Sequence, residues 1–194
     1  MRWHGLGIAL LAGILGVAAP VSAQTGQSPV YVELATDMGD IVLELYPSKA
    51  PETVDNFLDY VADYYYDGLI FHRVVDGFVI QTGGYRFDLT PAREPGEPVV
   101  NESGNGLKNR TGTVAMARHP DPDSARAQFY INLADNTNLD PAGGKPGYTV
   151  FGRVVDGMSV VEAIGRLPVR RTDRFEHLPT ETVRILSARK VSPP

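Results

Sequence analysis

Hydrophobic and polar residues alternate in two runs near the start of the chain, residues 30–36 and 41–46. In the first run Val32 and Leu34 alternate with Tyr31, Glu33 and Ala35. In the second run Ile41, Leu43 and Leu45 alternate with Val42, Glu44 and Tyr46. A turn with a glycine, residues 37–40, separates them. Two alternating runs around such a turn predict a β-hairpin.

The hydrophobic period then changes from two residues to that of a helix. Val54, Phe57 and Val61 recur at helical spacing, which predicts an amphipathic helix over residues 51–64. Pro51 is suited to the first turn of that helix, because its missing N–H would have no intrahelical partner there. The prediction is therefore one amphipathic helix after the hairpin, ended by Gly68.

The rest of the chain predicts short strands, a long ordered loop over residues 86–110 that is rich in proline and glycine, and a second helix over residues 158–166. The strand candidates are residues 78–81, 112–118, 128–133, 149–155 and 183–188. This order of elements predicts either an α+β fold or a closed β-barrel with two helices.

The N-terminal segment has the pattern of a secretory signal peptide, residues 1–23. Arg2 precedes an uninterrupted run of apolar and small residues over 5–19, Pro20 ends that run, and small residues over 21–23 suit a signal peptidase. The run is shorter than the roughly 20 residues that span a bilayer. An N-terminal anchor or a buried helix is the alternative interpretation.

Cleavage after Ala23 would divide the chain into three parts. Residues 24–29 form a polar lead-in, which we expect to be mobile, and residues 30–194 form one domain. No later segment is apolar enough to cross a membrane, so we expect an exported product, periplasmic or secreted, without a membrane association.

Composition excludes several functional classes. The 194 residues carry a net charge of −5 and no cysteine. A disulfide framework, a thiol nucleophile and a cysteine zinc site are therefore excluded. The negative charge offers no electrostatic footprint for nucleic acid or for an anionic membrane.

Motifs for phosphate loops, zinc proteases and α/β-hydrolases are also missing from the sequence. The histidines after the signal segment, His72, His119 and His177, are widely spaced, so we expect no metal site. Two glycosylation sequons, at Asn101 and Asn109, matter only if the exporting cell glycosylates. A carbohydrate-active barrel using paired carboxylates stays open as a weaker alternative.

Four stretches carry the most specific signal. They are FHRVVDGFVIQTGG at 71–84, NGLKNRTGTVAMAR at 105–118, SARAQFYINLADNTNLD at 124–140 and GYTVFGRVVDGMSVVEAI at 147–164. In order and spacing they resemble the cyclophilin-type peptidyl-prolyl cis/trans isomerases, most closely the exported bacterial members. The resemblance implies a mainly β fold, a closed eight-stranded antiparallel β-barrel capped by two α-helices. It also implies a monomer without a cofactor that acts on proline-containing polypeptides.

The chemistry of that reaction explains which residue types it needs. Rotation about an Xaa–Pro bond is slowed by amide resonance, with a barrier of about 20 kcal/mol. A catalyst must stabilise the twisted amide, which needs an apolar seat for the proline ring and a fixed donor. It needs no nucleophile, metal or cofactor. The planar, permanently charged guanidinium of Arg73 is the candidate donor.

The resemblance assigns further residues to the site. It places Arg73, Phe78 and Gln81 in the catalytic group, with Gln81 and Gln128 holding the peptide backbone and supporting Arg73. His72 is interpreted as a structural, hydrogen-bonded histidine, since the reaction transfers no proton. The resemblance also puts Phe78 in the proline seat, together with Val79, Tyr130 and Leu139. The remaining substrate-binding residues are Ala117 and Arg118, at an edge for the substrate backbone, and Tyr148 at the rim.

Some positions depart from the family pattern. Val79 stands where many members have methionine, and Thr82 replaces a glycine. Asn138 stands where eukaryotic members carry the tryptophan used by cyclosporin, so we expect weak cyclosporin binding. Arg118 replaces the usual asparagine, and Tyr148 replaces the usual histidine, as it does in exported bacterial relatives. A proline-peptide binding chaperone or assembly factor with weak catalysis on the same fold is the second hypothesis.

Overall fold

The computed structural model of the protein describes residue 1, residues 27–93 and residues 95–194. The signal peptide predicted over residues 1–23 lies outside the described residues except for Met1, and so do residues 24–26 of the lead-in. Residues 27–29 are exposed and have no regular secondary structure. No helix in the described part of the chain is long and apolar enough to cross a membrane.

The N-terminal hairpin is confirmed. Strand β1 (Val30–Thr36) pairs with β2 (Gly39–Leu45) in a continuous antiparallel register from Val30 opposite Leu45 to Thr36 opposite Gly39. The Thr36 hydroxyl accepts from the Met38 N–H and donates to the Gly39 carbonyl, which closes the turn. The alternating apolar residues of both strands point into the core, as the period of two requires.

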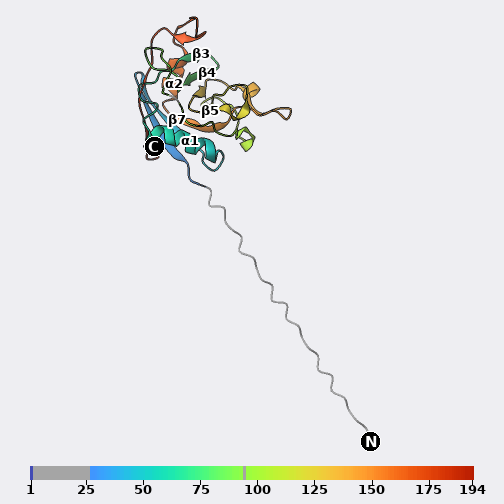
Figure 1. Ribbon diagram of the computed structural model, residues 1–194. Helices are drawn as coiled ribbons and strands as arrows, with labels where there is room; N and C mark the ends of the chain where they lie inside the picture. The colour runs from blue at the N-terminus through green and yellow to red at the C-terminus, as the bar shows by residue number, and fades with distance from the viewer. Residues whose placement is uncertain (2–26, 94) are drawn as a thin grey trace.

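Eight strands form one antiparallel sheet in the order β10-β1-β2-β7-β5-β6-β4-β3. The remaining members are β3 (Arg73–Val75), β4 (Val79–Thr82), β5 (Thr113–Met116), β6 (Phe129–Asn132), β7 (Val150–Asp156) and β10 (Ile185–Val191). A separate short pair joins β8 (Val169–Arg170) to β9 (Leu178–Pro179). Figure 1 shows how strongly the large sheet curls.

The prediction of a closed barrel is wrong, although the eight antiparallel strands and two helices are confirmed. The end strands β3 and β10 do not pair with each other, so the sheet is an open, curled half-barrel. The segment before β3 instead meets the start of β10, at an isolated bridge between Ile70 and Arg184 and through the Ile185 N–H, which donates to the Leu69 carbonyl. Strand β3 has three residues and begins after that bridge, which leaves too little chain for a ladder across the gap.

Helix α1 (Pro51–Ala62) begins with Pro51 in its first turn, as predicted, but ends two residues early. Tyr64 has a φ of 57°, a left-handed conformation that a helix cannot include. The helix has no side-chain cap of its own. Glu102, from the long loop, accepts instead from the Glu52 and Thr53 N–H groups, where a negative charge also favours the helix dipole.

The core lies between α1 and the concave face of the sheet. Phe57 of α1 packs on Tyr66, Phe129 and Phe151 with ring centroids 5.2–5.3 Å apart. Aromatic pairs at this spacing each contribute about 0.5–1.5 kcal/mol beyond the area they bury. Helix α2 (Met158–Gly165) lies toward β3, away from α1 (Figure 1). The core therefore packs against one face of the curled sheet, and the opposite face of β4, β5 and β6 is available for a binding site.

Candidate active site

The site is built on the face of β4, β5 and β6 that points away from the core. Because side chains alternate along a strand, Ile80 and Ile131 enter the main core while Val79 and Tyr130 point to the other face. There they form a second, smaller apolar cluster with Ala115 and Val150. Alternate side chains of the same strands thus form part of the core on one face and the floor of the site on the other.

A cavity of about 320 Å³ lies over this second cluster. Nine of the ten residues predicted for the site line it, and the tenth, Gln128, is hydrogen-bonded to one of them. The lining residues are Arg73, Phe78, Val79, Gln81, Ala117, Arg118, Tyr130, Leu139 and Tyr148. The structure therefore brings together residues that are up to 75 positions apart in the sequence.

A row of hydrogen-bonded polar side chains lies along one wall of the cavity. Arg73 on β3 lies opposite Gln81 on β4 in the antiparallel register, and its Nη1 donates to Gln81 Oε1 at 3.4 Å. Gln81 Nε2 donates in turn to Gln128 Oε1 at 3.0 Å. The guanidinium carbon of Arg73 also lies 5.8 Å from the ring centroid of Phe78. Arg73 is thus oriented by an amide and an aromatic ring, neither of which neutralises its charge.

A glycine allows the two glutamines to meet. Gly83, just after β4, has a φ of +90°, and a Cβ there would lie 2.6 Å from the Ala127 carbonyl oxygen and 2.9 Å from the Gln128 Cα. No side chain fits at those distances, and the conformation itself favours glycine. The chain before β6 can therefore approach β4 closely enough for Gln128 to reach Gln81.

The apolar wall and floor of the cavity come from the predicted proline seat. Val79 and Tyr130 are 1% and 4% exposed, so they form the floor, whereas Phe78, Leu139 and Tyr148 are half-buried and form the walls. The Tyr130 and Tyr148 rings pack edge to face, with centroids 6.0 Å apart. Two of these wall residues are joined directly, because the Tyr148 N–H donates to the Leu139 carbonyl at 2.9 Å.

A buried polar network supports the floor, and sequence reasoning missed it. The Tyr130 hydroxyl donates to Asn109 Oδ1 at 2.9 Å, and Asn109 donates to Asp140 Oδ1 through its N–H at 2.8 Å and its Nδ2 at 3.1 Å. Burial raises the pKa of Tyr130, which keeps its hydroxyl protonated as a donor. Asn109 is fully buried in this network, so its sequon is inaccessible in the folded protein.

The rim carries Ala117 and Arg118. The Ala117 N–H already donates to the Gln128 carbonyl, so the edge predicted there offers a substrate backbone a carbonyl acceptor and not an N–H. Arg118 stacks over Tyr148 with its guanidinium carbon 4.6 Å from the ring centroid. The same guanidinium donates to four backbone carbonyls, those of residues 119, 120, 146 and 147.

His72 lies beneath Arg73, packed against Tyr85 and Phe175 with ring centroids 4.9 and 6.3 Å away. Burial lowers its pKa to about 4, so the ring is neutral at pH 7. Its Nδ1 is buried and has no hydrogen-bond partner among the described residues.

The described part of the chain contains no cluster of three or more metal-ligating side chains.

Comparison with known proteins decides the family. A family model described as cyclophilin type peptidyl-prolyl cis-trans isomerase/CLD matches residues 31–190. The chain belongs to this family. Its activity is therefore that of a cyclophilin-type peptidyl-prolyl cis-trans isomerase, and the resemblance of the four sequence stretches to this family is confirmed.

Individual cyclophilins agree with this assignment over most of their length. The chain is 41% identical to a peptidyl-prolyl cis-trans isomerase of Acinetobacter baylyi, over 93% of each chain. It is 46% identical to peptidyl-prolyl cis-trans isomerase B of Escherichia coli, over 80% of this chain and 96% of that one. A crystal structure of a Cryptosporidium parvum cyclophilin, determined in the presence of the dipeptide Ala-Pro, is similar with a TM-score of 0.70 and 26% identity. It covers 84% of this chain and 99% of that chain.

Proposed function

We propose that Arg73 catalyses Xaa–Pro rotation by stabilising the twisted imide over the apolar cavity. The observation that carries this proposal is the position of Arg73, a charged donor on the wall of a cavity whose floor and other walls are mainly apolar. A guanidinium donor aimed at the imide favours the state in which the proline nitrogen has lost conjugation with its carbonyl. Such an interaction is stronger in the transition state than in the ground state, as catalysis requires.

The neighbours of Arg73 have supporting roles in this proposal. Gln81 fixes the guanidinium fork through the 3.4 Å hydrogen bond, and Gln128 fixes the Gln81 amide. Holding the donor before the substrate arrives avoids reorganisation during the reaction. Phe78, Val79, Tyr130, Leu139 and Tyr148 seat the proline ring, whereas Ala117 and Arg118 hold the flanking backbone. The reaction transfers no proton, which agrees with the neutral, buried state of His72.

The substrates in this proposal are proline-containing segments of unfolded or flexible polypeptides. The size of the cavity, about 320 Å³, and its largely apolar floor suit a proline ring rather than a large ligand. The related Cryptosporidium structure, determined in the presence of Ala-Pro, supports the same substrate class. Because Asn138 is exposed and offers no indole, we propose that cyclosporin binds weakly, and we propose that the protein acts as a monomer.

The cellular site of action in this proposal is outside the cytoplasm. Residues 1–23 have the charge, apolar run and small-residue exit of a signal peptide, and cleavage would leave a cysteine-free chain starting at Gln24. A periplasm fits this best, with secretion as the alternative. Fusion of residues 1–23 to a reporter that is active only after export tests this. Export with cleavage after Ala23 supports the proposal, and retention in the cytoplasm overturns it.

NMR exchange spectroscopy on a short Xaa–Pro peptide tests the activity. The protein starting at Gln24 should accelerate exchange between the cis and trans peptide at substoichiometric concentration. Binding of the peptide with no change in exchange rate would contradict catalysis and favour a proline-peptide binding chaperone. The same sample reports the affinity through peptide line shapes, so binding and catalysis are separated in one experiment.

A further inference from the structure

Most arginines on the described surface are compensated by a carboxylate. Their N···O distances run from 2.6 to 3.5 Å. The pairs are Arg93–Asp63, Arg110–Asp135, Arg153–Glu44, Arg166–Glu162, Arg171–Glu176, Arg184–Asp37 and Arg189–Asp67. These positive charges therefore add little to the field around the molecule.

Four arginines near the active site differ, because among the described residues they have no carboxylate partner. Arg118 donates only to backbone carbonyls, and Arg126 donates to the Gly96 carbonyl. Arg174 donates to the Leu89 carbonyl at 2.7 Å, and Arg73 donates to an amide oxygen. Carbonyl dipoles fix these side chains in place without removing their charge. Arg86 and Arg170, which line none of the cavities described next, also lack an ion pair.

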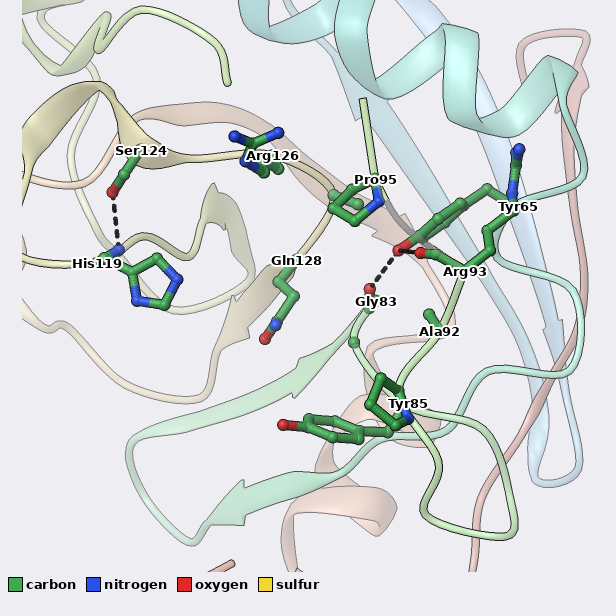
Figure 2. Close-up of a pocket in the computed structure, with 13 residues that line it drawn as sticks. Tyr65, Gly83, Tyr85, Ala92, Arg93, Pro95, His119, Ser124, Arg126 and Gln128 are labelled. Atoms are coloured by element: carbon green, nitrogen blue, oxygen red, sulfur yellow. Dashed lines mark hydrogen bonds between the residues drawn. The ribbon is translucent and has the colours of Figure 1, made fainter. Parts of the chain in front are cut away.

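The four arginines line three adjoining cavities. The active-site cavity shares Arg73 with a second cavity of about 290 Å³, which Arg174 also lines. That second cavity shares Tyr85 and Gln128 with a third, of about 220 Å³, lined by Arg126. In Figure 2, which shows the third cavity, Gln128 lies between Tyr85 and Arg126. The three cavities thus form one row, with Arg73 at the boundary of the first and second and Gln128 at the boundary of the second and third.

Acidic side chains are nearly excluded from this row of cavities. Glu176 is the single carboxylate among the described residues lining the three cavities, and Arg171 engages it at 3.5 Å. One other arginine, Arg93, lines the third cavity but pairs with Asp63. The protein as a whole carries a charge of −5, so the positive character is local to the site. Such a local field attracts anionic groups within about a Debye length, roughly 10 Å at 0.1 M salt.

We propose that the site selects Xaa–Pro segments whose flanking residues are aspartate or glutamate, with Arg126 and Arg174 as the specificity-determining residues. This inference rests on the proposed function, since the proline occupies the active-site cavity at one end of the row, and the residues that follow it on one side along the peptide enter the second and third cavities. An extended peptide suits this row of cavities because it is long enough to cross them, and its side chains alternate in direction along the chain. The overall negative charge of the protein disfavours a nucleic acid as the occupant.

Two matched peptides test this inference. Both contain Ala-Pro, and the positions two and three residues from the proline on each side carry Asp in one peptide and the near-isosteric Asn in the other. NMR titration gives the affinity and NMR exchange gives the rate. At low salt we expect the Asp peptide to be preferred by about 3- to 10-fold, as two exposed charge pairs would supply. The preference should approach one in 1 M NaCl, where charges are screened beyond about 3 Å.

The variants Arg126→Gln and Arg174→Gln should each lower the preference by about 2- to 5-fold, the effect of one exposed charge pair. Arg166→Gln is the matched control, because it removes the same charge from an exposed ion pair on α2 and should leave the preference unchanged. Equal affinities for both peptides, or equal losses in all three variants, would overturn the inference. If neither peptide is isomerised, the proposed function fails, and the ratio of affinities still decides the charge preference.

Discussion

Arg73 and Gln81 are cross-strand partners in the β3–β4 pair, and their side chains are joined by a 3.4 Å hydrogen bond from Nη1 to Oε1. The register of a short hairpin therefore fixes the direction of the guanidinium. Gln81 on β4 also donates to Gln128, which lies just before β6. The orientation of Arg73 therefore depends on β4 and on the start of β6, and not on β3 alone. The three-residue strand β3 would otherwise be a weak support for a residue that must stay in place.

This relationship predicts that Gln81 acts through Arg73. The variant Gln81→Leu removes the acceptor while keeping a side chain of similar size. We expect kcat/KM to fall about 10-fold, the equivalent of one lost hydrogen bond to a charged group. Peptide affinity should change little, since the apolar seat is intact. In an Arg73→Ala background the same substitution should have no further effect. A second independent loss there would show that Gln81 acts on the substrate directly.

The hydroxyl of Tyr130 should contribute to stability and not to catalysis. It donates to Asn109 Oδ1 inside the buried network, while the ring alone faces the cavity. Tyr130→Phe should lower the free energy of unfolding by about 1 kcal/mol, because a buried acceptor loses a donor. Urea denaturation measures this. The control Tyr148→Phe removes a hydroxyl that makes no hydrogen bond among the described residues, and should stay within about 0.5 kcal/mol. Equal effects of the two substitutions would contradict the role of the network.

His72 should make the protein less stable in mild acid. Burial lowers its pKa to about 4 in the folded state, from an ordinary value of 6.5. As pH falls below about 6.5 the unfolded chain takes up the proton first, so the free energy of unfolding decreases by about 1.4 kcal/mol per pH unit until about pH 4. Between pH 6.5 and 5.5 most carboxylates stay ionised, which isolates the histidine contribution.

Urea unfolding at pH 6.5 and 5.5 measures that contribution. The variant His72→Gln should lose most of the decrease between the two values. His119→Gln is the control, because His119 is exposed at the rim of the third cavity. If His72→Gln keeps the full decrease, another group is responsible for the pH dependence.

Much of the fold could be predicted from local patterns. The alternation over β1 and β2 and the helical spacing over α1 each depend on neighbouring residues, and both predictions are confirmed. Strands β3, β8 and β9 have two or three residues, too few to show an alternation, and they were missed. Barrel closure depends on how the two end strands meet, which no local pattern reports, and that prediction was wrong.

The candidate site could be located from the sequence because its residues lie in four distinctive stretches. The buried polar network that supports the site could not be located in this way. Asn109 lies 21 positions from Tyr130 and 31 positions from Asp140, so nothing in the sequence pairs them before the chain is folded. The same holds for Glu102, which caps α1 from 49 positions away. Long-range polar contacts of this kind are specified by the fold and not by periodicity.

The central claim is that Arg73 stabilises the transition state and contributes little to binding. NMR exchange on one Xaa–Pro peptide, with the parent protein, Arg73→Ala and Arg73→Lys, tests it most directly because rate and affinity come from the same sample. We expect Arg73→Ala to lower catalysed exchange by about 100-fold or more, the loss typical of one preorganised donor. Its affinity should stay within a few-fold of the parent, and Arg73→Lys, which keeps the charge without the fork, should be intermediate. Parallel losses of rate and affinity, or an unchanged rate, would contradict the account.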